Sequence, residues 1–370
     1  MAEALKYHLN ATVAARIARQ VQSAHPTFDT QAFLATALHQ FEHLALMPRA
    51  KHIAAALRQY LPEHYPQAID ILVASLGPKL PQPDNNGVAP LMYLPHVFFV
   101  SRYGLDFFAE SMAAQYEITQ RFTAEFSLRP FLQKYPEQSL AMLQRWATDP
   151  SVLVRRLVSE GTRPRLPWAA RLPDFQRDPS PVIPLLEALK NDPELYVRRS
   201  VANHLNDIGK DNPDILMALA ARWLQTPSPH ILWLIKHALR FAVKAGDGRA
   251  LALLGCGQTP DIVVQACTLT PTYARLGDTL CVHIQVHSTA TTAQRLMVDL
   301  RVFYVKANGR TSPKVFKLKT LQLAAADTVQ LNKKIPLMNR TTRQHHAGEH
   351  AVEILINGHS YPVGAFFLTL

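Results

Sequence analysis

The sequence contains an internal repeat, in which Asp149-Pro-Ser-Val-Leu-Val-Arg-Arg returns 43 residues later as Asp192-Pro-Glu-Leu-Tyr-Val-Arg-Arg. A weaker copy begins at Ser228-Pro-His. Each copy opens with a residue that favours the cap of a helix, followed by proline, which is favoured at the first helical position. A period of about 40 residues is typical of HEAT-type helical hairpins, which stack into a solenoid with a concave face. The repeat therefore predicts a mainly α protein built as a HEAT-like repeat α-solenoid.

The pattern changes from helix to strand in the last third of the chain. Residues 1–260 are rich in alanine and leucine at helical spacing, whereas Cys281–His287 and several later stretches alternate apolar and polar residues. Asn308-Gly309 and Asn357-Gly358 are strong signals for tight hairpins, because glycine accepts a positive φ. We therefore expect a helical-repeat domain over residues 1–260, followed by a small C-terminal immunoglobulin-like β-sandwich over residues 265–370.

The charge balance favours a polyanionic partner. The 370 residues include 39 Lys and Arg against 28 Asp and Glu, a net charge of +11, and the β-domain has the higher density of positive charge. A hydrophobic content of 48% excludes a disordered chain, and a count of three cysteines excludes a disulfide scaffold. The alternative is that the charge only keeps the surface soluble.

The sequence predicts neither a membrane segment nor a metal centre. No apolar run approaches the roughly 18 residues of a membrane helix, and the N-terminus lacks the continuous apolar stretch of a secretory signal. The three cysteines form no Cys-x-x-Cys pair, which indicates reduced thiols. His345, His346, His350 and His359 lie in the β-domain without a cysteine or carboxylate cage. We therefore expect a cytoplasmic protein without a metal or an organic cofactor.

Polar residues recur at helical spacing in four rows, and acids stand among the cations. With the 43-residue offset, Arg156 aligns with Arg199 and Glu160 with Asn203, so stacked repeats would place these rows side by side. The rows are Arg121, Glu125 and Arg129; Arg156, Glu160 and Arg163; Arg199, Asn203 and Asp207; and Lys236 with Arg240. They predict a basic surface across successive helices, with acids set inside it.

Periodicity alone leaves two interpretations of these rows open. Salt bridges on helix surfaces would explain them, although each pair contributes only about 0.3–0.5 kcal/mol and Arg before Glu is the less favoured order. In the other interpretation, the cations bind DNA phosphates while the carboxylates stabilise positive charge that develops on a sugar.

A loop between the two strong repeats carries three arginines and one tryptophan over residues 161–171. Its two prolines favour an extended chain, and Trp168 beside arginines suits stacking on a sugar, a base or a cationic ring. The alternative is a tryptophan packed between repeats. Trp146, Trp223 and Trp233 lie in apolar helical stretches and are expected in the core.

Three strings of sequence together resemble one known family. Thr123–Phe131, Ser159–Trp168 and Tyr196–Asp207 are similar to the AlkC branch of the bacterial AlkC/AlkD DNA alkylation-repair glycosylases, and the β-domain resembles the immunoglobulin-like domain found in part of this branch. The resemblance implies a monofunctional DNA glycosylase of base excision repair. Its substrates would be cationic N3-alkylated bases in duplex DNA, chiefly 3-methyladenine and secondarily 3-methylcytosine. It also implies catalysis without full base flipping and without a cofactor.

The resemblance further implies roles for individual residues. Glu125, Glu160 and Asp207 would form the acidic site, and Trp168 would pack against the lesion sugar or base. DNA phosphates would be held by Arg156, Arg163, Arg165, Arg198 and Arg199, and the polar rows add Asn203, Lys236 and Arg240. The expected partner is double-stranded DNA containing alkylated bases, bound by a monomer that is nucleoid-associated while on DNA.

The rival hypothesis is a non-catalytic HEAT-like scaffold that binds DNA or an acidic protein. Such a scaffold needs the basic groove but neither the carboxylates nor Trp168. The two hypotheses therefore differ on whether the fold gathers Glu125, Glu160 and Trp168 around one point. A helix-hairpin-helix glycosylase is a remote third option, because the sequence lacks a glycine-rich hairpin leading to a catalytic aspartate.

Overall fold

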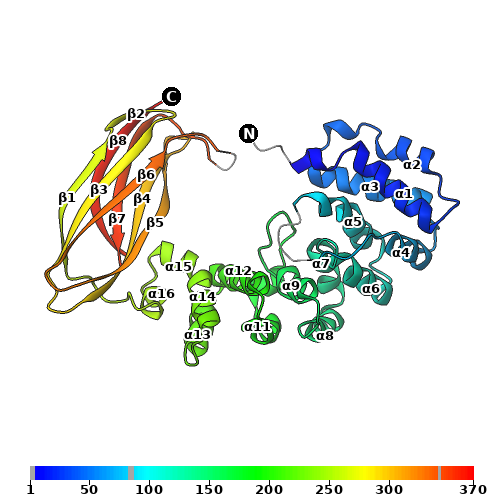
Figure 1. Cartoon of the computed structure of the whole chain (residues 1–370), viewed down its shortest axis with the longest axis horizontal. Helices are drawn as coiled ribbons and strands as arrows, with labels where there is room; N and C mark the ends of the chain where they lie inside the picture. The colour runs from blue at the N-terminus through cyan, green and yellow to red at the C-terminus, as the bar shows by residue number, and fades with distance from the viewer. Residues whose placement is uncertain (1–4, 82–86, 341–342) are drawn as a thin grey trace. The chain divides into compact units, whose positions relative to one another are not determined.

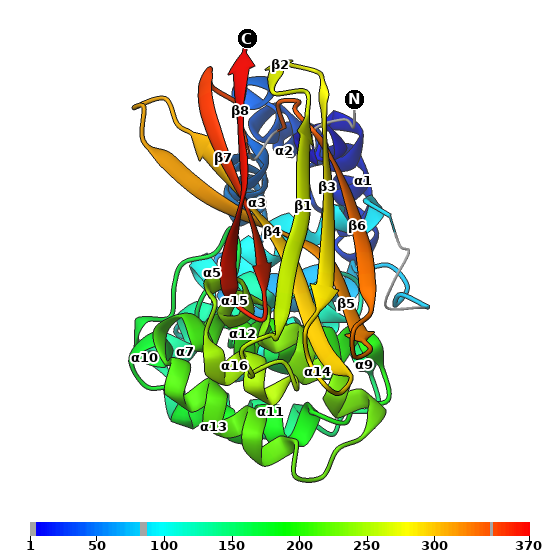
Figure 2. The same ribbon diagram turned by 90° about the vertical axis from the view of Figure 1, so that its left-hand side faces the viewer.

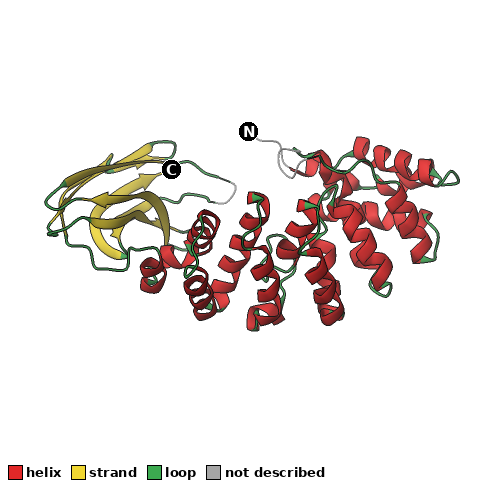
Figure 3. Ribbon diagram, turned by 60° about the horizontal axis from the view of Figure 1, so that its bottom comes forward, coloured by secondary structure: helices red, strands yellow, loops and turns green. Residues whose placement is uncertain are grey.

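The computed structural model describes residues 5–81, 87–340 and 343–370. Helices occupy the chain up to Leu253 and strands begin at Ile262, so the two kinds of element are segregated along the sequence (Figures 1 and 3). The fold is therefore mainly α with a C-terminal β-sandwich, which confirms the predicted fold class. Among the described residues, none of the helices has both the length and the apolar character needed to cross a membrane.

Contacts divide the chain into two compact units. Unit 1 comprises residues up to Leu216 together with Trp223–Ala238, and unit 2 comprises Met217–Arg222 together with Leu239–Leu370. The helices up to Ala238 are α1 (Ala11–Ala24), α2 (Thr30–Ala37), α3 (Leu46–Tyr60), α4 (Tyr65–Ala74), α5 (Leu94–Tyr103), α6 (Phe108–Thr119), α7 (Glu125–Lys134), α8 (Pro136–Trp146), α9 (Val152–Gly161), α10 (Pro173–Arg177), α11 (Ile183–Leu189), α12 (Leu195–Asp211), α13 (Pro213–Trp223) and α14 (Pro229–Ala238). Short 3₁₀ turns lie at Leu5–His8, Phe41–His43, Ala89–Tyr93 and Ser180–Val182.

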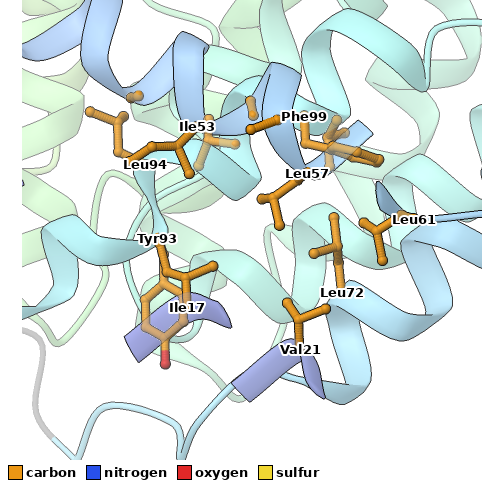
Figure 4. Packing of buried hydrophobic residues seen from close by; sticks show 14 of the residues in the cluster. Ile17, Val21, Ile53, Leu57, Leu61, Leu72, Tyr93, Leu94 and Phe99 are labelled. Atoms are coloured by element: carbon orange, nitrogen blue, oxygen red, sulfur yellow. The ribbon is translucent and has the colours of Figure 1, made fainter. Parts of the chain in front are cut away.

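Amphipathic helices build the core of unit 1. In α1, Ala14, Ile17, Ala18 and Val21 recur at helical spacing and are all fully buried. The Asn10 side chain caps this helix by accepting a hydrogen bond from the backbone N–H three residues later at 3.1 Å. Figure 4 shows how side chains of several helices meet in this cluster; it labels Ile17, Val21, Ile53, Leu57, Leu61, Leu72, Tyr93, Leu94 and Phe99.

The two strong repeats start their helices in the same way, but the helix does not begin at the proline. The carboxylates of Asp149 and Asp192 accept hydrogen bonds from the backbone N–H two residues later, at 2.7 and 2.9 Å, so each Asp-Pro pair forms a turn before its helix. Arg155 and Arg198, the first arginines of the repeats, donate back to the carbonyl oxygens of that Asp and Pro. The predicted cap holds for Ser228, which accepts from a backbone N–H of α14 at 3.1 Å.

Three of the four predicted rows are not single helix faces. Arg121 precedes α7, which begins at Glu125, and Arg163 follows the end of α9. Arg240 begins a new helix instead of continuing the one that carries Lys236. Spacing alone missed these ends, because residues of the turns between helices continue the periodic pattern by chance.

The fourth row, Arg199, Asn203 and Asp207, does lie on the single helix α12. It runs from an exposed residue through a half-buried one to a buried one. Four residues turn a helix by about 400°, so each step of the row rotates about 40° away from the previous residue. The row therefore enters the interior of unit 1 instead of staying on its surface.

The β-sandwich of unit 2 consists of two sheets that share one core (Figure 2). The sheets have the strand orders β1-β3-β6 and β2-β8-β7-β4-β5, and neighbours are antiparallel except for β2 and β8. The strands are β1 (Ile262–Thr270), β2 (Tyr273–Arg275), β3 (Thr279–Ser288), β4 (Gln294–Val305), β5 (Thr311–Leu323), β6 (Thr328–Pro336), β7 (Gly348–Ile356) and β8 (His359–Thr369). Asn357 and Gly358 both have positive φ, 49° and 83°, and close the predicted two-residue hairpin between β7 and β8.

Two short helices also belong to unit 2, namely α15 (Arg240–Ala245) and α16 (Gly248–Leu253). Leu251 and Cys256 form a small buried cluster with Met297 of β4. The second compact unit therefore includes chain upstream of the point, near residues 260–265, where the sequence pattern changes from helix to strand.

Candidate active site

Three helices of unit 1 bring the predicted acids together. α9 contacts both α7 and α12. Glu125 is the first residue of α7, Glu160 lies in the last turn of α9, and Asp207 lies in the second half of α12. Because stacked helical repeats place successive helices side by side, acids that are far apart in sequence become neighbours.

The acids alternate with arginines in one continuous chain of ion pairs. Arg156 Nη1 donates to Glu125 Oε2 at 2.9 Å, and its Nη2 lies 3.6 Å from Glu160 Oε1. Arg163 Nη1 donates to Glu160 Oε1 at 2.6 Å, and Arg163 Nε donates to Asp207 Oδ2 at 2.8 Å. The side chains therefore follow the order Glu125, Arg156, Glu160, Arg163, Asp207, and each acid has a guanidinium partner.

Further donors hold the same carboxylates and leave one oxygen open. Ser200 Oγ donates to Glu160 Oε2 at 2.7 Å, and Lys210 Nζ donates to Asp207 Oδ1 at 3.0 Å. The hydroxyl of the threonine two residues before Glu125 donates to Glu125 Oε2 at 2.8 Å. Within the described part of the chain, no donor is bonded to Glu125 Oε1. Glu125 thus keeps an acceptor for a water or a ligand.

The Glu160 carboxyl is ionised at neutral pH. Burial alone would raise its pKa, but the positive charges of Arg156 and Arg163 and the hydrogen bond from Ser200 outweigh burial, so the pKa is lowered. A general base works best when its pKa lies near the operating pH, so this carboxylate is poorly suited to taking a proton. It is well suited to stabilising positive charge that forms close by.

Trp168 is displayed on the loop that follows α9. Its backbone has a positive φ of 64°, and 72% of its surface is exposed. Arg129 donates hydrogen bonds to backbone carbonyl oxygens before and after Trp168 in the sequence. Its Nε donates to Ala170 O at 2.7 Å, and its Nη1 donates to Arg163 O at 2.8 Å and Gly161 O at 3.2 Å. The exposed side chain contradicts the alternative of a tryptophan packed between repeats.

Glu125, Glu160 and Trp168 line one cavity of about 340 Å³, which we call the carboxylate cavity. Among the residues that the structure describes, its other polar lining residue is Thr123. The apolar remainder of its lining is Leu5, Leu46, Met47, Leu91, Leu94, Phe122, Phe126, Leu166 and Pro167. Asp207 does not line it and is only 1% exposed. The fold therefore gathers the three residues whose clustering distinguishes an active site from a basic scaffold.

Most of the arginines predicted to bind phosphates have partners within the protein. Arg156 and Arg163 belong to the chain of ion pairs, and the Arg156 guanidinium also lies 4.9 Å above the Tyr196 ring. Arg165 Nε donates to Asp211 at 2.7 Å. Arg198, expected to contact DNA, is buried and donates to two carbonyl oxygens at the start of its own helix.

The remaining predicted DNA contacts are more accessible. Arg199 and Lys236 are exposed, while Asn203 and Arg240 are half-buried. His237 Nε2 lies 3.2 Å from Asn203 Oδ1, so α12 and α14 are joined at this point. The exposed cations among the predicted DNA contacts thus lie on α12 and α14.

Sequence reasoning missed three residues that hold the site together and placed a fourth, Arg129, only in a row of surface cations. Thr123, Ser200 and Lys210 each donate to one of the acids, and Arg129 holds the Trp168 loop. A threonine just before a helix is a recognisable signal, and Lys210 stands three residues after Asp207 on the same helix. The contacts of Ser200 and Arg129 cross 32–41 residues of sequence and follow only from the packing of the repeats.

A buried neutral histidine lies behind the ion pairs. His204 Nδ1 donates to Ser159 O at 3.0 Å, and burial, with the charge of Arg163 nearby, lowers the pKa of His204 to about 3. Burial also lowers the pKa of His96, in the core of unit 1, to about 4. In the unfolded chain both side chains titrate near pH 6.5, as an ordinary histidine does at about that value.

The free energy of unfolding is expected to fall as the pH drops from about 6.5 to about 4. Over that range the unfolded chain binds protons that His204 and His96 do not accept in the folded state, and each pKa unit of difference is worth about 1.4 kcal/mol. His204→Asn, which keeps a donor for the Ser159 carbonyl, should make the unfolding free energy less dependent on pH. Urea unfolding at several pH values measures the slope of this free energy against pH in the parent protein and in the variant. Identical slopes would contradict a neutral, buried His204.

The described residues contain no group of three or more His, Cys, Asp or Glu side chains placed to hold a metal ion. The histidines of the β-domain are among the residues searched. His350 is fully buried; it accepts a hydrogen bond from Val305 N at 3.2 Å, and its Nε2 lies 3.2 Å from His346 O. This contact pattern is that of a histidine within a protein core.

Comparisons with known proteins cover the whole chain. The family described as "Uncharacterised protein YhaZ, C-terminal Ig-like domain" matches residues 263–370. The uncharacterized protein YhaZ of Bacillus subtilis (strain 168) is 36% identical over 355 residues, which are 96% of each chain. The solved structure of Pseudomonas fluorescens alkylpurine DNA glycosylase AlkC, bound to DNA containing an abasic site analog, matches with a TM-score of 0.92 and 37% identity over 100% of both chains. The chain therefore belongs to the AlkC branch of the AlkC/AlkD family, in the group that carries a C-terminal immunoglobulin-like domain.

Proposed function

We propose that this protein is a DNA glycosylase that hydrolyses the N-glycosidic bond of cationic N3-alkylated bases in duplex DNA. The observation that carries the proposal is the carboxylate cavity, where Glu125 and Glu160 lie beside the exposed Trp168. The full-length similarity to AlkC, whose structure contains DNA with an abasic site analog, supports DNA as the partner. We further propose a monomer, acting on nucleoid DNA in the cytoplasm.

The chemistry of such bases fits a site of carboxylates. A base alkylated at N3 carries a positive charge, so the C1′–N bond breaks with its electron pair moving to the base, which leaves as a neutral molecule. The sugar then carries the positive charge in an oxocarbenium-like state. Water adds to C1′ and loses a proton to solvent. Fixed negative charge near C1′ stabilises the transition state of the first step, as preorganised charges do in other enzymes.

In this proposal the three acids have different roles, which their contacts support. Glu125, with Oε1 open, would contact the sugar or orient the water that attacks it. Glu160 would add negative charge at the cavity wall while both its oxygens are held by the protein. Asp207, which is buried, would position Arg163 and would not touch the substrate. Arg156 and Arg163 would fix the carboxylates and would not bind phosphates.

The lining of the cavity supports catalysis without full base flipping. A pocket that reads an extruded base needs groups that hydrogen-bond its Watson–Crick edge. Here the polar lining consists of two carboxylates and Thr123, whose hydroxyl already donates to Glu125. Selection would therefore depend on the positive charge of the lesion, and Trp168 would pack against its sugar or base.

One assay tests the function directly. Base release is measured from duplex DNA methylated at known positions, with 3-methyladenine, 3-methylcytosine and 7-methylguanine quantified separately. We expect release of 3-methyladenine above the spontaneous rate, and 3-methylcytosine as the second substrate. If no base is released while the protein still binds the DNA, the non-catalytic scaffold becomes the better hypothesis.

We also propose that the β-sandwich is a DNA-binding accessory domain. Lys317 and Lys319 are exposed on the edge strand β5, on either side of a shift in its register with β4. Replacing both by glutamine should lower the slope of log Kd against log salt by about two, because each lost phosphate contact removes about 0.9. The matched control replaces Arg16 and Arg19, exposed on α1, by glutamine. An unchanged slope in the lysine variant would argue for another role of the domain.

A further inference from the structure

A second cavity of about 420 Å³ adjoins the carboxylate cavity, and the two share Met47, Phe126 and Trp168. Its walls come from α3, α5, α7 and the loop after α9. None of the steps proposed above for bond cleavage uses it. We call it the basic cavity, because of the side chains described next.

The charged residues that line the basic cavity are all positive. They are Lys51 of α3, Arg102 of α5 and Arg129 of α7. Lys51 and Arg102 are exposed, and within the described ranges neither has a carboxylate partner. In contrast to the arginines around Glu160, these two cations are therefore available to an anion from outside, and no acid lines the cavity among the described residues.

Flat aromatic surfaces accompany these cations. The rings of Phe98 and Phe126 stack with centroids 6.3 Å apart and planes 25° apart, and Lys51 Nζ lies 5.3 Å from the Phe98 ring. Trp168 adds a ring that is largely exposed. Arg129 is 3% exposed, and its Nη2 has no hydrogen-bond partner among the described residues. A buried donor without a partner is uncommon in a folded protein.

We infer that the basic cavity binds one nucleotide of the DNA strand next to the lesion, with its base against the Phe98 and Phe126 rings and its phosphate held by Lys51 and Arg102. Aromatic rings beside cations are the combination by which proteins bind single nucleotides without reading sequence. A volume of about 420 Å³ lies within the range of small-ligand sites. This inference rests on the proposed function, since it takes DNA as the partner.

The first test measures binding of the full-length protein to a duplex with a tetrahydrofuran abasic analogue, by fluorescence anisotropy over a range of salt concentrations. Lys51→Gln with Arg102→Gln should weaken binding and lower the salt slope by about 0.9, the value for one lost phosphate contact. Both side chains are exposed, so the fold should be retained. The control is Arg16→Gln with Arg19→Gln, on a helix that lines neither cavity. Equal slopes in the test and control variants would overturn the inference.

The second test detects the stacked base. 2-Aminopurine is placed on the 5′ side of the abasic analogue in one duplex and on the 3′ side in another. Its fluorescence should be quenched on binding in one of the two, and the quenching should be lost with Lys51→Gln and Arg102→Gln. No quenching in either duplex would overturn the inference.

A third arm distinguishes the DNA strand from a free nucleotide. Free dAMP is titrated against the abasic duplex as a competitor, and we expect competition only at concentrations at least 100-fold above those of the duplex. Competition at equal concentrations would assign the cavity to free nucleotides and overturn the inference. Failure of the proposed function has a different signature, because loss of all base release would leave the salt slope and the 2-aminopurine signal unaffected.

Discussion

Glu125→Gln is expected to lower the rate of base release from 3-methyladenine DNA by about 100- to 1,000-fold, the usual effect of removing one preorganised electrostatic group. Glu125 lines the carboxylate cavity, and its Oε1 is the carboxylate oxygen to which no donor is bonded within the described residues. Glutamine keeps the size of the side chain but removes the charge that would face the sugar. Binding to DNA with an abasic analogue should change less than about threefold, because no phosphate contact is lost.

Single-turnover base release and anisotropy with the same duplex separate these two effects. The matched control is Glu117→Gln, which also removes a carboxylate that accepts from an arginine, at 2.7 Å from Arg121, but lines neither cavity. It should excise at the rate of the parent protein. If Glu125→Gln also excised at that rate, Glu125 would have no catalytic role, whatever its position.

Glu160→Gln tests how the three acids divide the work. Both Glu160 oxygens already accept hydrogen bonds, from Arg163 and Ser200. We expect this variant to lose activity as well, but also about 1–3 kcal/mol of unfolding free energy, since a neutral amide leaves buried donors poorly paired. Loss of both activity and stability in Glu160→Gln, with loss of activity alone in Glu125→Gln, would support the proposed roles.

The architecture was predictable because its signal repeats. The Asp-Pro and Val-Arg-Arg elements at Asp149 and Asp192 recur at one offset, and the period itself implies stacked helices. The offset also places Glu160 and Asp207 on helices that the structure shows in contact. The pattern recurs because each repeat forms the same Asp-Pro turn, and its first arginine donates to the carbonyl oxygen of that aspartate.

The partners of the arginines were not predictable in the same way. The spacing of the rows predicts that their arginines are surface cations. In the structure, Arg163 instead lies between two acids, and Arg129 donates to backbone carbonyl oxygens of a distant loop. Those contacts depend on where helices end and how α9 meets its neighbours, which hydrophobic spacing does not encode. The net charge of +11 consequently overstates the cations available to DNA in this region.

The largest expected effect on stability is that of Arg163→Met. Arg163 is 7% exposed in the folded chain, and its guanidinium bonds both Glu160, at 2.6 Å, and Asp207, at 2.8 Å. Methionine fills similar space but leaves two buried carboxylates with reduced compensation. Breaking a buried ion pair in this way costs about 3–5 kcal/mol, which urea unfolding at pH 7 would show as a lower midpoint.

The pH dependence of this loss identifies its cause. Without Arg163, the buried Glu160 carboxyl loses one of the two positive charges that lower its pKa, so in the folded variant it takes up a proton at a higher pH than in the parent protein. The difference in unfolding free energy between parent and variant should therefore shrink between about pH 7 and about pH 4. Arg165→Met removes a more exposed pair with Asp211 and should cost no more than about 1 kcal/mol at either pH. If the loss in Arg163→Met stayed constant with pH, lost packing and not unpaired charge would be responsible, and the ion-pair chain would not be what stabilises this site.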